Sequence, residues 1–180
     1  MRVTIARVAA GLMVLAVVGT AWAHGPTRRK VLESTEINAP PAKVWAVIGS
    51  FQDINWLEPV AKTEGEKGNE IGATRRLTLK NGATVDEELY KFDAEKMSYS
   101  YRITAVDVKV LPVTNYSSTI TVSPSADGKG SLVEWTGAFY RGFPNNDPPP
   151  ELNDEAAIKA VTGLYHDGLA GLKKKIESGS

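Results

Sequence analysis

The sequence has no cysteine and only two histidines among its 180 residues. No disulfide can therefore stabilise the fold, and a catalytic zinc with three histidine or cysteine ligands has too few of them. Gly-x-Ser-x-Gly, Walker and Gly-x-Gly-x-x-Gly patterns are also missing, which removes the usual signals for a serine nucleophile and for nucleotide binding. The sequence therefore predicts no catalytic residue, no metal and no cofactor.

Neither sign of charge dominates, since 21 Lys and Arg stand against 21 Asp and Glu. A nucleic-acid partner is not predicted, because such a protein needs a basic surface to displace counterions. The apolar run from Val8 to Gly19 follows Arg2 and Arg7 and precedes Ala21-Trp22-Ala23, which is the order of a signal peptide and its cleavage site. This run is shorter than the ~20 residues that span a bilayer. We therefore predict cleavage and no stable membrane insertion.

Cleavage after Ala23 makes residues 1–23 a signal peptide and the periplasm the expected location. It removes two of the 21 basic residues and no acidic one, which leaves 19 against 21 in the mature chain. A free His24 can chelate copper with its amine and imidazole, and His166 can complete the site, but the simpler interpretation is that His24 only marks the cleavage point. Residues 24–29 predict a flexible arm, and residues 30–180 a single domain.

Residues 30–38 are rich in β-branched side chains and predict a strand, which Ala39-Pro40-Pro41 ends. Pro41 suits the first position of a short helix that Gly49 ends, and Asp53 can cap a second short helix that carries Trp56. The apolar face of the first helix comprises Val44, Trp45, Val47 and Ile48. Between Val60 and Tyr140, turn residues at short intervals predict an antiparallel sheet, with Asn81-Gly82 as the best hairpin signal.

The last strand and the C-terminal helix give the clearest patterns. Alternation places Val133, Trp135, Gly137 and Phe139 on the inner face of the strand. Glu151 to Glu177 predicts the longest helix, with acidic residues at its start and Lys173 to Lys175 at its end. One apolar stripe should lie on the sheet, formed by Ile158, Val161, Tyr165, Leu169, Leu172 and Ile176. The fold class is therefore α+β.

Four segments carry a resemblance to a known family: Ile37-Asn-Ala-Pro-Pro-Ala-Lys-Val-Trp45, Glu87-x-Leu89-x-x-x-Asp93, Tyr99-x-Tyr101-x-Ile103 and Val133-Glu-Trp135. Together with the order of one strand, two short helices, six strands and a long helix, they resemble the START and Bet v 1-like superfamily, also called SRPBCC. The resemblance covers nearly all of Lys30 to Glu177. It implies a helix-grip fold, in which a curved antiparallel sheet wraps around the C-terminal helix. It implies no single activity, because the superfamily includes lipid carriers, cyclases, hydrolase-like enzymes and binding proteins.

One subgroup is especially similar. The exported start, followed by His-Gly-Pro and the Ala-Pro-Pro-Ala-Lys-Val-Trp segment, resembles the MxaD-like accessory proteins of periplasmic methanol oxidation. That resemblance implies a helper of a methanol dehydrogenase that promotes contact with its cytochrome c acceptor. Two alternatives remain: a carrier of a hydrophobic small molecule in the helix-grip cavity, and a polyketide cyclase-like enzyme that uses Arg75, Glu87 and the tyrosines. The lack of a recognisable set of catalytic residues favours a non-enzymatic role.

Side chains alternate between the two faces of a strand, so Tyr99, Tyr101 and Ile103 are expected on one face. The same alternation directs Arg75 and Glu87 inward. Opposite charges under a helix are costly unless they pair or meet a ligand. A register shift of one residue would place both charges in solvent instead, and the sequence leaves both interpretations open. The residues expected to line a ligand-binding cavity are Arg75, Glu87, Tyr99, Tyr101, Tyr116, Trp135, Phe139, Tyr165 and Trp56, with Trp45 and Tyr90 as further candidates; each aromatic also suits ordinary core.

Three other features are open to two interpretations. Gly163, Gly168 and Gly171 each weaken the last helix by ~1 kcal/mol relative to alanine, which suggests close packing or room for a ligand. The loop from Arg141 to Pro150, with three consecutive prolines, is a gate at the cavity mouth or a plain connector. The run Asp86-Glu87-Glu88 alternates between faces, so it makes a poor acid and base pair and suits a solvated edge better.

Overall fold

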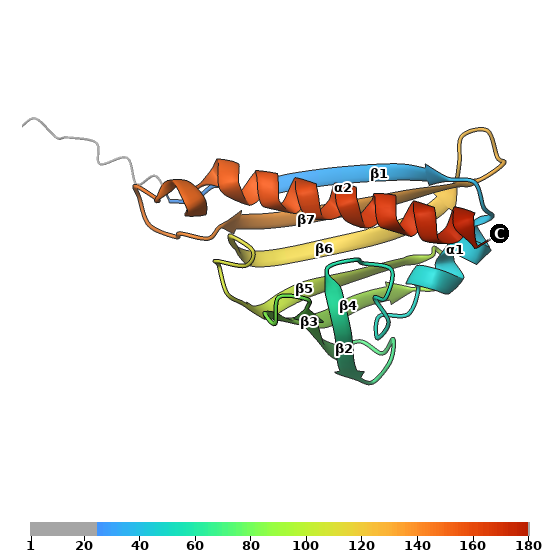
Figure 1. Cartoon of the computed structure of the whole chain (residues 1–180), viewed down its shortest axis with the longest axis horizontal. Coiled ribbons are helices and arrows are strands. Elements are labelled where there is room, and N and C mark those ends of the chain that lie inside the picture. The colour runs from blue at the N-terminus through green and yellow to red at the C-terminus, as the bar shows by residue number, and fades with distance from the viewer. Residues whose placement is uncertain (1–24, 180) are drawn as a thin grey trace, which may run out of the picture.

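The computed structural model describes residues 25–179. The predicted signal peptide, its cleavage site and His24 lie outside the described residues. Seven antiparallel strands form one sheet in the order β1-β7-β6-β5-β4-β3-β2, with a long helix against it (Figure 1). The elements are β1 Arg29–Ile37, α1 Pro41–Ile48, β2 Val60–Glu66, β3 Thr74–Leu79, β4 Thr84–Asp93, β5 Ser98–Val106, β6 Val113–Pro124, β7 Ser131–Arg141, the 3-10 helix η1 Pro150–Leu152 and α2 Asp154–Ser178. Within residues 25–179, no helix has the length and apolar character needed to cross a membrane.

The connection between β1 and β2 differs in part from the prediction. Helix α1 begins at Pro41 and ends at Ile48, and the N–H of the following Gly49 donates to the Trp45 carbonyl at 2.7 Å. The second short helix is wrong, because residues 51–59 form a series of turns. The Asp53 carboxylate accepts from the backbone N–H of Asn55 at 3.0 Å, an arrangement that competes with helix formation. Pro59 then has no N–H to continue a helix.

The hairpin between β3 and β4 confirms the strongest turn signal. Gly82 has a positive φ of 84°, which glycine adopts without strain, and its N–H donates to the Leu79 carbonyl at 2.9 Å. The Asn81 side chain accepts from the Ala83 N–H at 3.0 Å. This turn sets a register in which Arg75 lies opposite Glu87.

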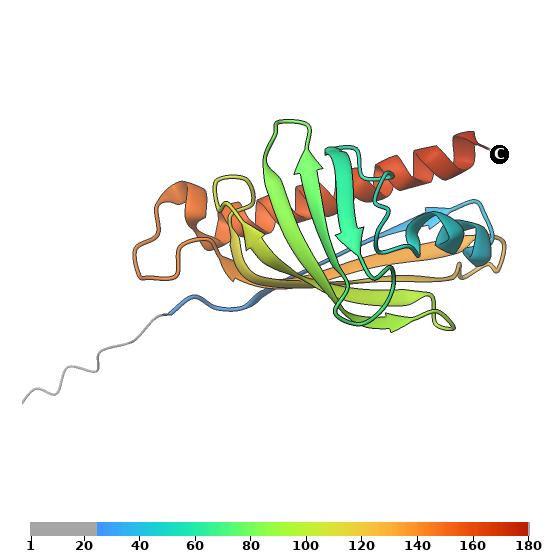
Figure 2. The same cartoon turned by 90° about the horizontal axis from the view of Figure 1, so that it is seen from below.

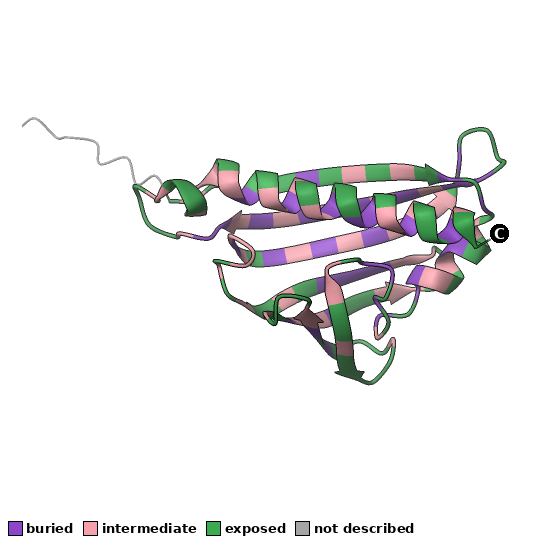
Figure 3. Ribbon diagram, in the orientation of Figure 1, coloured by how far each residue is buried: buried purple, intermediate pink, exposed green. Residues whose placement is uncertain are grey.

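Helix α2 begins after Asn153, whose side-chain oxygen accepts from the Ala156 N–H at 2.8 Å. The predicted apolar stripe is correct except at its start, because Ile158 is 36% exposed. Ala157 occupies the buried position four residues before Val161, so Ile158 is turned about 100° toward solvent. Figure 3 shows the buried residues of α2, coloured on the ribbon, along the side of the helix that faces the sheet. The buried residues of α2 are Ala157, Val161, Tyr165, Gly168, Leu169, Leu172 and Ile176.

The sheet has two parts that relate differently to α2. Helix α2 packs mainly along β1 and β7, while β2, β3 and β4 bend away from the plane of these strands and rise beside the helix (Figures 1 and 2). β5 and β6 pair only between Ser98–Arg102 and Ser117–Thr121. Beyond Arg102, β5 pairs with β4 alone. We call β2–β4 with residues 103–106 of β5 the sheet arm. A predicted helix-grip fold is thus confirmed, with one short helix after β1.

Candidate functional site

A cavity of about 240 Å³ lies between α2, the sheet arm and two loops. Most of its wall is aliphatic. The lining residues are Ile54, Leu57, Pro59, Val60, Leu77, Leu79, Val85, Glu87, Tyr101, Ile103, Val110, Leu111, Tyr116, Trp135, Ala160 and Leu164. An apolar wall with a few polar groups is typical of small-molecule sites.

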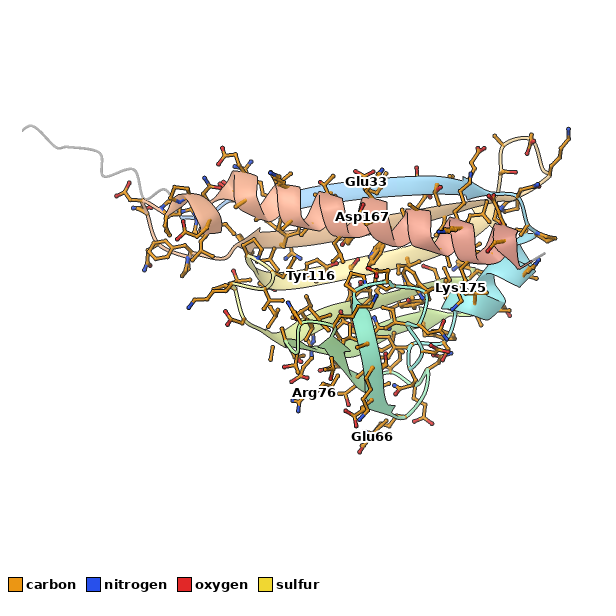
Figure 4. All side chains as sticks on the ribbon, viewed as in Figure 1. Glu33, Glu66, Arg76, Tyr116, Asp167 and Lys175 are labelled. Atoms are coloured by element: carbon orange, nitrogen blue, oxygen red, sulfur yellow. The ribbon has the colours of Figure 1, made fainter. Side chains whose placement is uncertain are left out.

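Four of the nine predicted cavity residues belong to this wall, namely Glu87, Tyr101, Tyr116 and Trp135. Figure 4 shows Tyr116 in the space between α2 and the sheet arm. The other five are buried without forming the wall: Arg75, Tyr99, Phe139, Tyr165 and Trp56. Tyr90, one of the further candidates, is 42% exposed at an irregularity in the pairing of β4 with β5. Trp45 is half-buried and packs against Phe92 and Tyr99, outside the wall.

Twelve of the sixteen wall residues were not among the predicted cavity residues. Val110 and Leu111 come from the loop between β5 and β6, and Ile54 and Leu57 from the turns before β2. These segments have no periodicity that predicts a direction for their side chains. Ala160 and Leu164 had a signal, because they are four residues apart on α2 and adjoin the buried stripe.

The charged pair at the cavity edge is buried, so the interpretation that places Arg75 and Glu87 in solvent is wrong. Their exposed fractions are 2% and 5%. Arg75 Nε donates to Glu87 Oε2 at 2.6 Å, and its Nη1 donates to the Phe51 carbonyl at 2.7 Å. The guanidinium carbon also lies 4.2 Å from the centre of the Phe51 ring and 5.1 Å from that of Tyr101. The pair is therefore held from several sides.

The two charges of this pair affect each other's titration. Burial is the largest single influence on the pKa of Arg75 and lowers it, but Glu87, Tyr99 and Tyr101 together raise it, so that the pKa is raised overall. Burial raises the pKa of the Glu87 carboxyl, and the Arg75 guanidinium opposes that rise. Only Glu87 belongs to the cavity wall, so a bound molecule meets a carboxyl group whose charge is already matched.

A hydrogen-bond network occupies another side of the cavity. Trp135 Nε1 donates to Ser118 Oγ at 2.8 Å and, less closely, to Tyr101 Oη at 3.2 Å. Ser118 Oγ donates to the Thr136 carbonyl at 2.9 Å and lies 3.0 Å from Tyr165 Oη. Tyr165 Oη lies 2.5 Å from Tyr116 Oη. We refer to Tyr101, Tyr116, Ser118, Trp135 and Tyr165 as the tyrosine network.

Close packing holds this network in place. The rings of Trp135 and Tyr165 are stacked with centroids 4.3 Å apart and an interplanar angle of 13°. A Cβ on Gly137 would lie 2.1 Å from Tyr165 Oη, and one on Gly168 would lie 2.9 Å from the Trp135 ring. Gly168 thus serves close packing, whereas Gly163 is exposed with nothing within 4 Å of its added Cβ.

The phenols of the network stay protonated over the physiological range. Burial raises the pKa of Tyr101 and of Tyr116 well above the usual value, and Glu87 adds to the rise at Tyr101. Burial also raises the pKa of Tyr165, although its bonds to Ser118 and Tyr116 oppose this. Protonated phenols can donate and accept hydrogen bonds, and they are poor general bases at neutral pH.

Residues 25–179 contain no cluster of three or more His, Cys, Asp or Glu side chains that would hold a metal ion. His166 is exposed, with Nδ1 3.0 Å from Asp167 Oδ1. Asp86 and Glu88 flank Glu87 on the outer face and pair with Arg76 and Arg102. The acidic run is therefore divided between faces, as alternation predicts.

The loop after β7 does not form part of the cavity wall. Arg141 organises it instead: Nε donates to the Phe143 carbonyl and Nη2 to the Asn145 carbonyl, each at 2.8 Å. Arg141 Nη1 also lies 3.4 Å from Asp154 at the start of α2. These contacts suit a connector that anchors the helix to the sheet.

Residues 28–177 match the model of the family described as polyketide cyclase / dehydrase and lipid transport. Among solved structures, a protein of Bacillus thuringiensis is 32% identical with a TM-score of 0.70, covering 83% of this chain and 99% of that one. XoxI of Bacillus cereus is 33% identical with a TM-score of 0.70, covering 82% and 95%. A protein of Nitrosospira multiformis, 22% identical with a TM-score of 0.68 over 84% and 100%, shares the fold. No protein of curated function matches the chain in sequence.

Proposed function

The chain belongs to the polyketide cyclase / dehydrase and lipid transport family, and on that premise we propose that it binds and carries a small, largely apolar molecule. The supporting observation is the cavity of about 240 Å³, walled mainly by aliphatic side chains, with the tyrosine network at one side. Aliphatic walls favour an apolar body, and the few polar groups orient it.

Binding fits the polar groups better than catalysis does. Glu87, the one carboxyl group that the described residues contribute to the wall, already accepts a hydrogen bond from Arg75 at 2.6 Å. The phenols of Tyr101 and Tyr116 have raised pKa values and do not act as bases near neutral pH. Among residues 25–179 the wall therefore contains no histidine, cysteine or unpaired carboxylate that would serve as a general base or nucleophile.

Isothermal titration calorimetry of the mature protein with α-methylstyrene, a small apolar probe, tests this proposal. Ala160→Phe places a phenyl ring in the cavity and should weaken binding by about tenfold or more. The matched control is Ala170→Phe, the same substitution on the exposed side of α2, which should change affinity by less than about twofold. Equal affinity in all three proteins would show that the probe does not enter the cavity, and absence of binding to the wild type would contradict the proposal.

A second candidate is an accessory role in periplasmic methanol oxidation, in contact with a methanol dehydrogenase or its cytochrome c. The resemblance of the Ala-Pro-Pro-Ala-Lys-Val-Trp segment to MxaD-like proteins supports it. Biolayer interferometry of the mature protein against both partners at moderate salt should give saturable binding if this role is correct. No binding to either partner would remove it and leave the carrier role unchanged.

A further inference from the structure

The tyrosine network leaves one buried hydrogen-bond donor unused at the cavity wall. Ser118 has a single hydroxyl hydrogen, and the Thr136 carbonyl accepts it at 2.9 Å. The 3.0 Å contact between Ser118 and Tyr165 therefore requires Tyr165 to donate. Tyr165 then has no hydrogen left for Tyr116, so Tyr116 must donate across their 2.5 Å contact. Each of these three hydroxyl hydrogens has an acceptor.

Tyr101 is different. Its oxygen accepts from Trp135 Nε1 at 3.2 Å, but no acceptor for its own hydrogen occurs among residues 25–179. Tyr101 is 2% exposed and belongs to the cavity wall. A buried donor without an acceptor carries a desolvation penalty, which a ligand oxygen at this position would remove.

The wall also restricts the charge of the ligand. An ion would exchange its hydration water for contacts with aliphatic side chains, and Glu87, the one charged group that residues 25–179 contribute to the wall, is already neutralised by Arg75. Arg75 does not form part of the wall, so it offers no direct contact to an anion. A neutral ligand is therefore favoured.

Volume gives the third restriction. The cavity volume of about 240 Å³ is far below that of a diacyl lipid. Such a space suits a small molecule such as one with a single ring or a short chain.

We propose that the cavity takes a small neutral carbonyl compound and that Tyr101 determines this specificity by donating its hydroxyl hydrogen to the ligand's carbonyl oxygen. The inference rests on the proposed carrier function and adds the chemical class of the ligand. It requires no reaction, because the ligand enters and leaves unchanged.

The test uses two probes of nearly equal shape, acetophenone and α-methylstyrene, which differ in having C=O or C=CH2 beside the ring. Calorimetric dissociation constants are measured for the wild type, Tyr101→Phe and Tyr99→Phe. Tyr101→Phe should weaken acetophenone binding relative to α-methylstyrene by about tenfold, because only the ketone loses a hydrogen bond. Tyr99→Phe is the matched control, since Tyr99 is equally buried but lies outside the wall, and the ratio of the two constants should stay unchanged.

The infrared carbonyl band of bound acetophenone gives a check on the wild type alone. A hydrogen bond from Tyr101 should lower the stretching frequency relative to acetophenone in hexane, and an unshifted band would overturn the inference even if Tyr101→Phe did not fold. If α-methylstyrene binds but the ratio is the same in Tyr101→Phe and in the wild type, the role of Tyr101 is wrong and the carrier function stands. If neither probe binds the wild type, both the carrier function and the ligand class are wrong.

Discussion

Helix α2 packs against a continuous core on one side and borders the cavity on the other. Along β1 and most of β6 and β7 the inner face is packed, with Tyr116 and Trp135 at the border of the cavity, and β7 alternates buried with half-buried residues over its whole length. Along the sheet arm, Leu79 and Ile103 are only half-buried although both point toward the helix, and the cavity lies between them and α2. Continuous strands can therefore hold both a packed region and a ligand site when part of the sheet leaves the helix.

Irregular pairing accounts for the difference. The pairing of β4 with β5 shifts register between Asp86 and Glu87 and again between Leu89 and Lys91, and β2 shifts between Val60 and Lys62. Such irregularities bend strands and increase twist. β1 pairs with β7 over its whole length without a shift, and β6 shifts against β7 between Thr114 and Ser117, near the start of β6. The arm thus curves away while the other half stays close to α2.

The largest expected loss of stability comes from removing a carboxylate charge in the sheet arm, and it should differ between the inner and the outer face. Glu87→Gln leaves Arg75 buried without its counter-charge and should destabilise the protein by about 3 kcal/mol. Asp86→Asn breaks the neighbouring pair with Arg76, whose side chain is 58% exposed, and should cost less than about 1 kcal/mol. Urea unfolding of both variants measures the difference, and equal costs would mean that Glu87 is not enclosed as described.

The next effect compares leucines on α2. Leu172 is fully buried, so Leu172→Ala should cost about 3 kcal/mol of unfolding free energy. Leu164 is half-buried at the cavity, where part of its surface has no protein neighbour, so Leu164→Ala should cost about 1 kcal/mol. Chemical denaturation gives both values. A loss at Leu164 as large as that at Leu172 would mean that the space beside Leu164 is filled.

The smallest expected loss of stability comes from changing Asp154, at the N-terminal end of α2. Arg29 and Arg141 bond the Asp154 carboxylate, and the bond from Arg29 is the main reason its pKa is lowered from 3.8. Because the pKa of Asp154 is lowered in the folded state, its carboxylate stabilises the fold at pH values above the usual pKa. This stabilisation is lost as the pH falls through the pKa of the folded state. Asp154→Asn should therefore cost about 1 kcal/mol at neutral pH, allowing for screening at the surface.

Acid titration of the same variant checks the sign. The stability difference between wild type and Asp154→Asn should be full above about pH 4, near the usual pKa of 3.8, and should shrink as pH falls toward 2. A difference that grows on acidification would contradict the assigned ion pairs.

Local signals predicted the fold well. Pro41 and Gly49 bound α1, Asn81-Gly82 forms the β3–β4 turn, and alternation places Trp135 on the inner face. The second short helix failed because the Asp53 side chain favours a turn over a helix. Ile158 failed because a spacing of three or four residues also fits a stripe that begins at Ala157.

The candidate site was less predictable, for a physical reason. Alternation shows that Tyr99, Phe139 and Trp135 point inward, but it does not show whether an atom or an empty space lies opposite each ring. Phe139 meets the Tyr116 ring at 6.2 Å, whereas Trp135 reaches the cavity. The contributions of Val110 and Leu111 depend on how the loop between β5 and β6 folds beside the cavity, which no local pattern specifies.

Xenon binding tests the central claim most directly, because xenon enters apolar cavities without needing any specific contact. A crystal of the mature protein under xenon pressure should show xenon between Leu77, Leu79 and Leu164, at the wall of the arm, and Ala160→Phe should remove it. Xenon at this position would establish an open apolar site beside α2. A wild-type crystal with no xenon there would contradict the cavity and, with it, the carrier function.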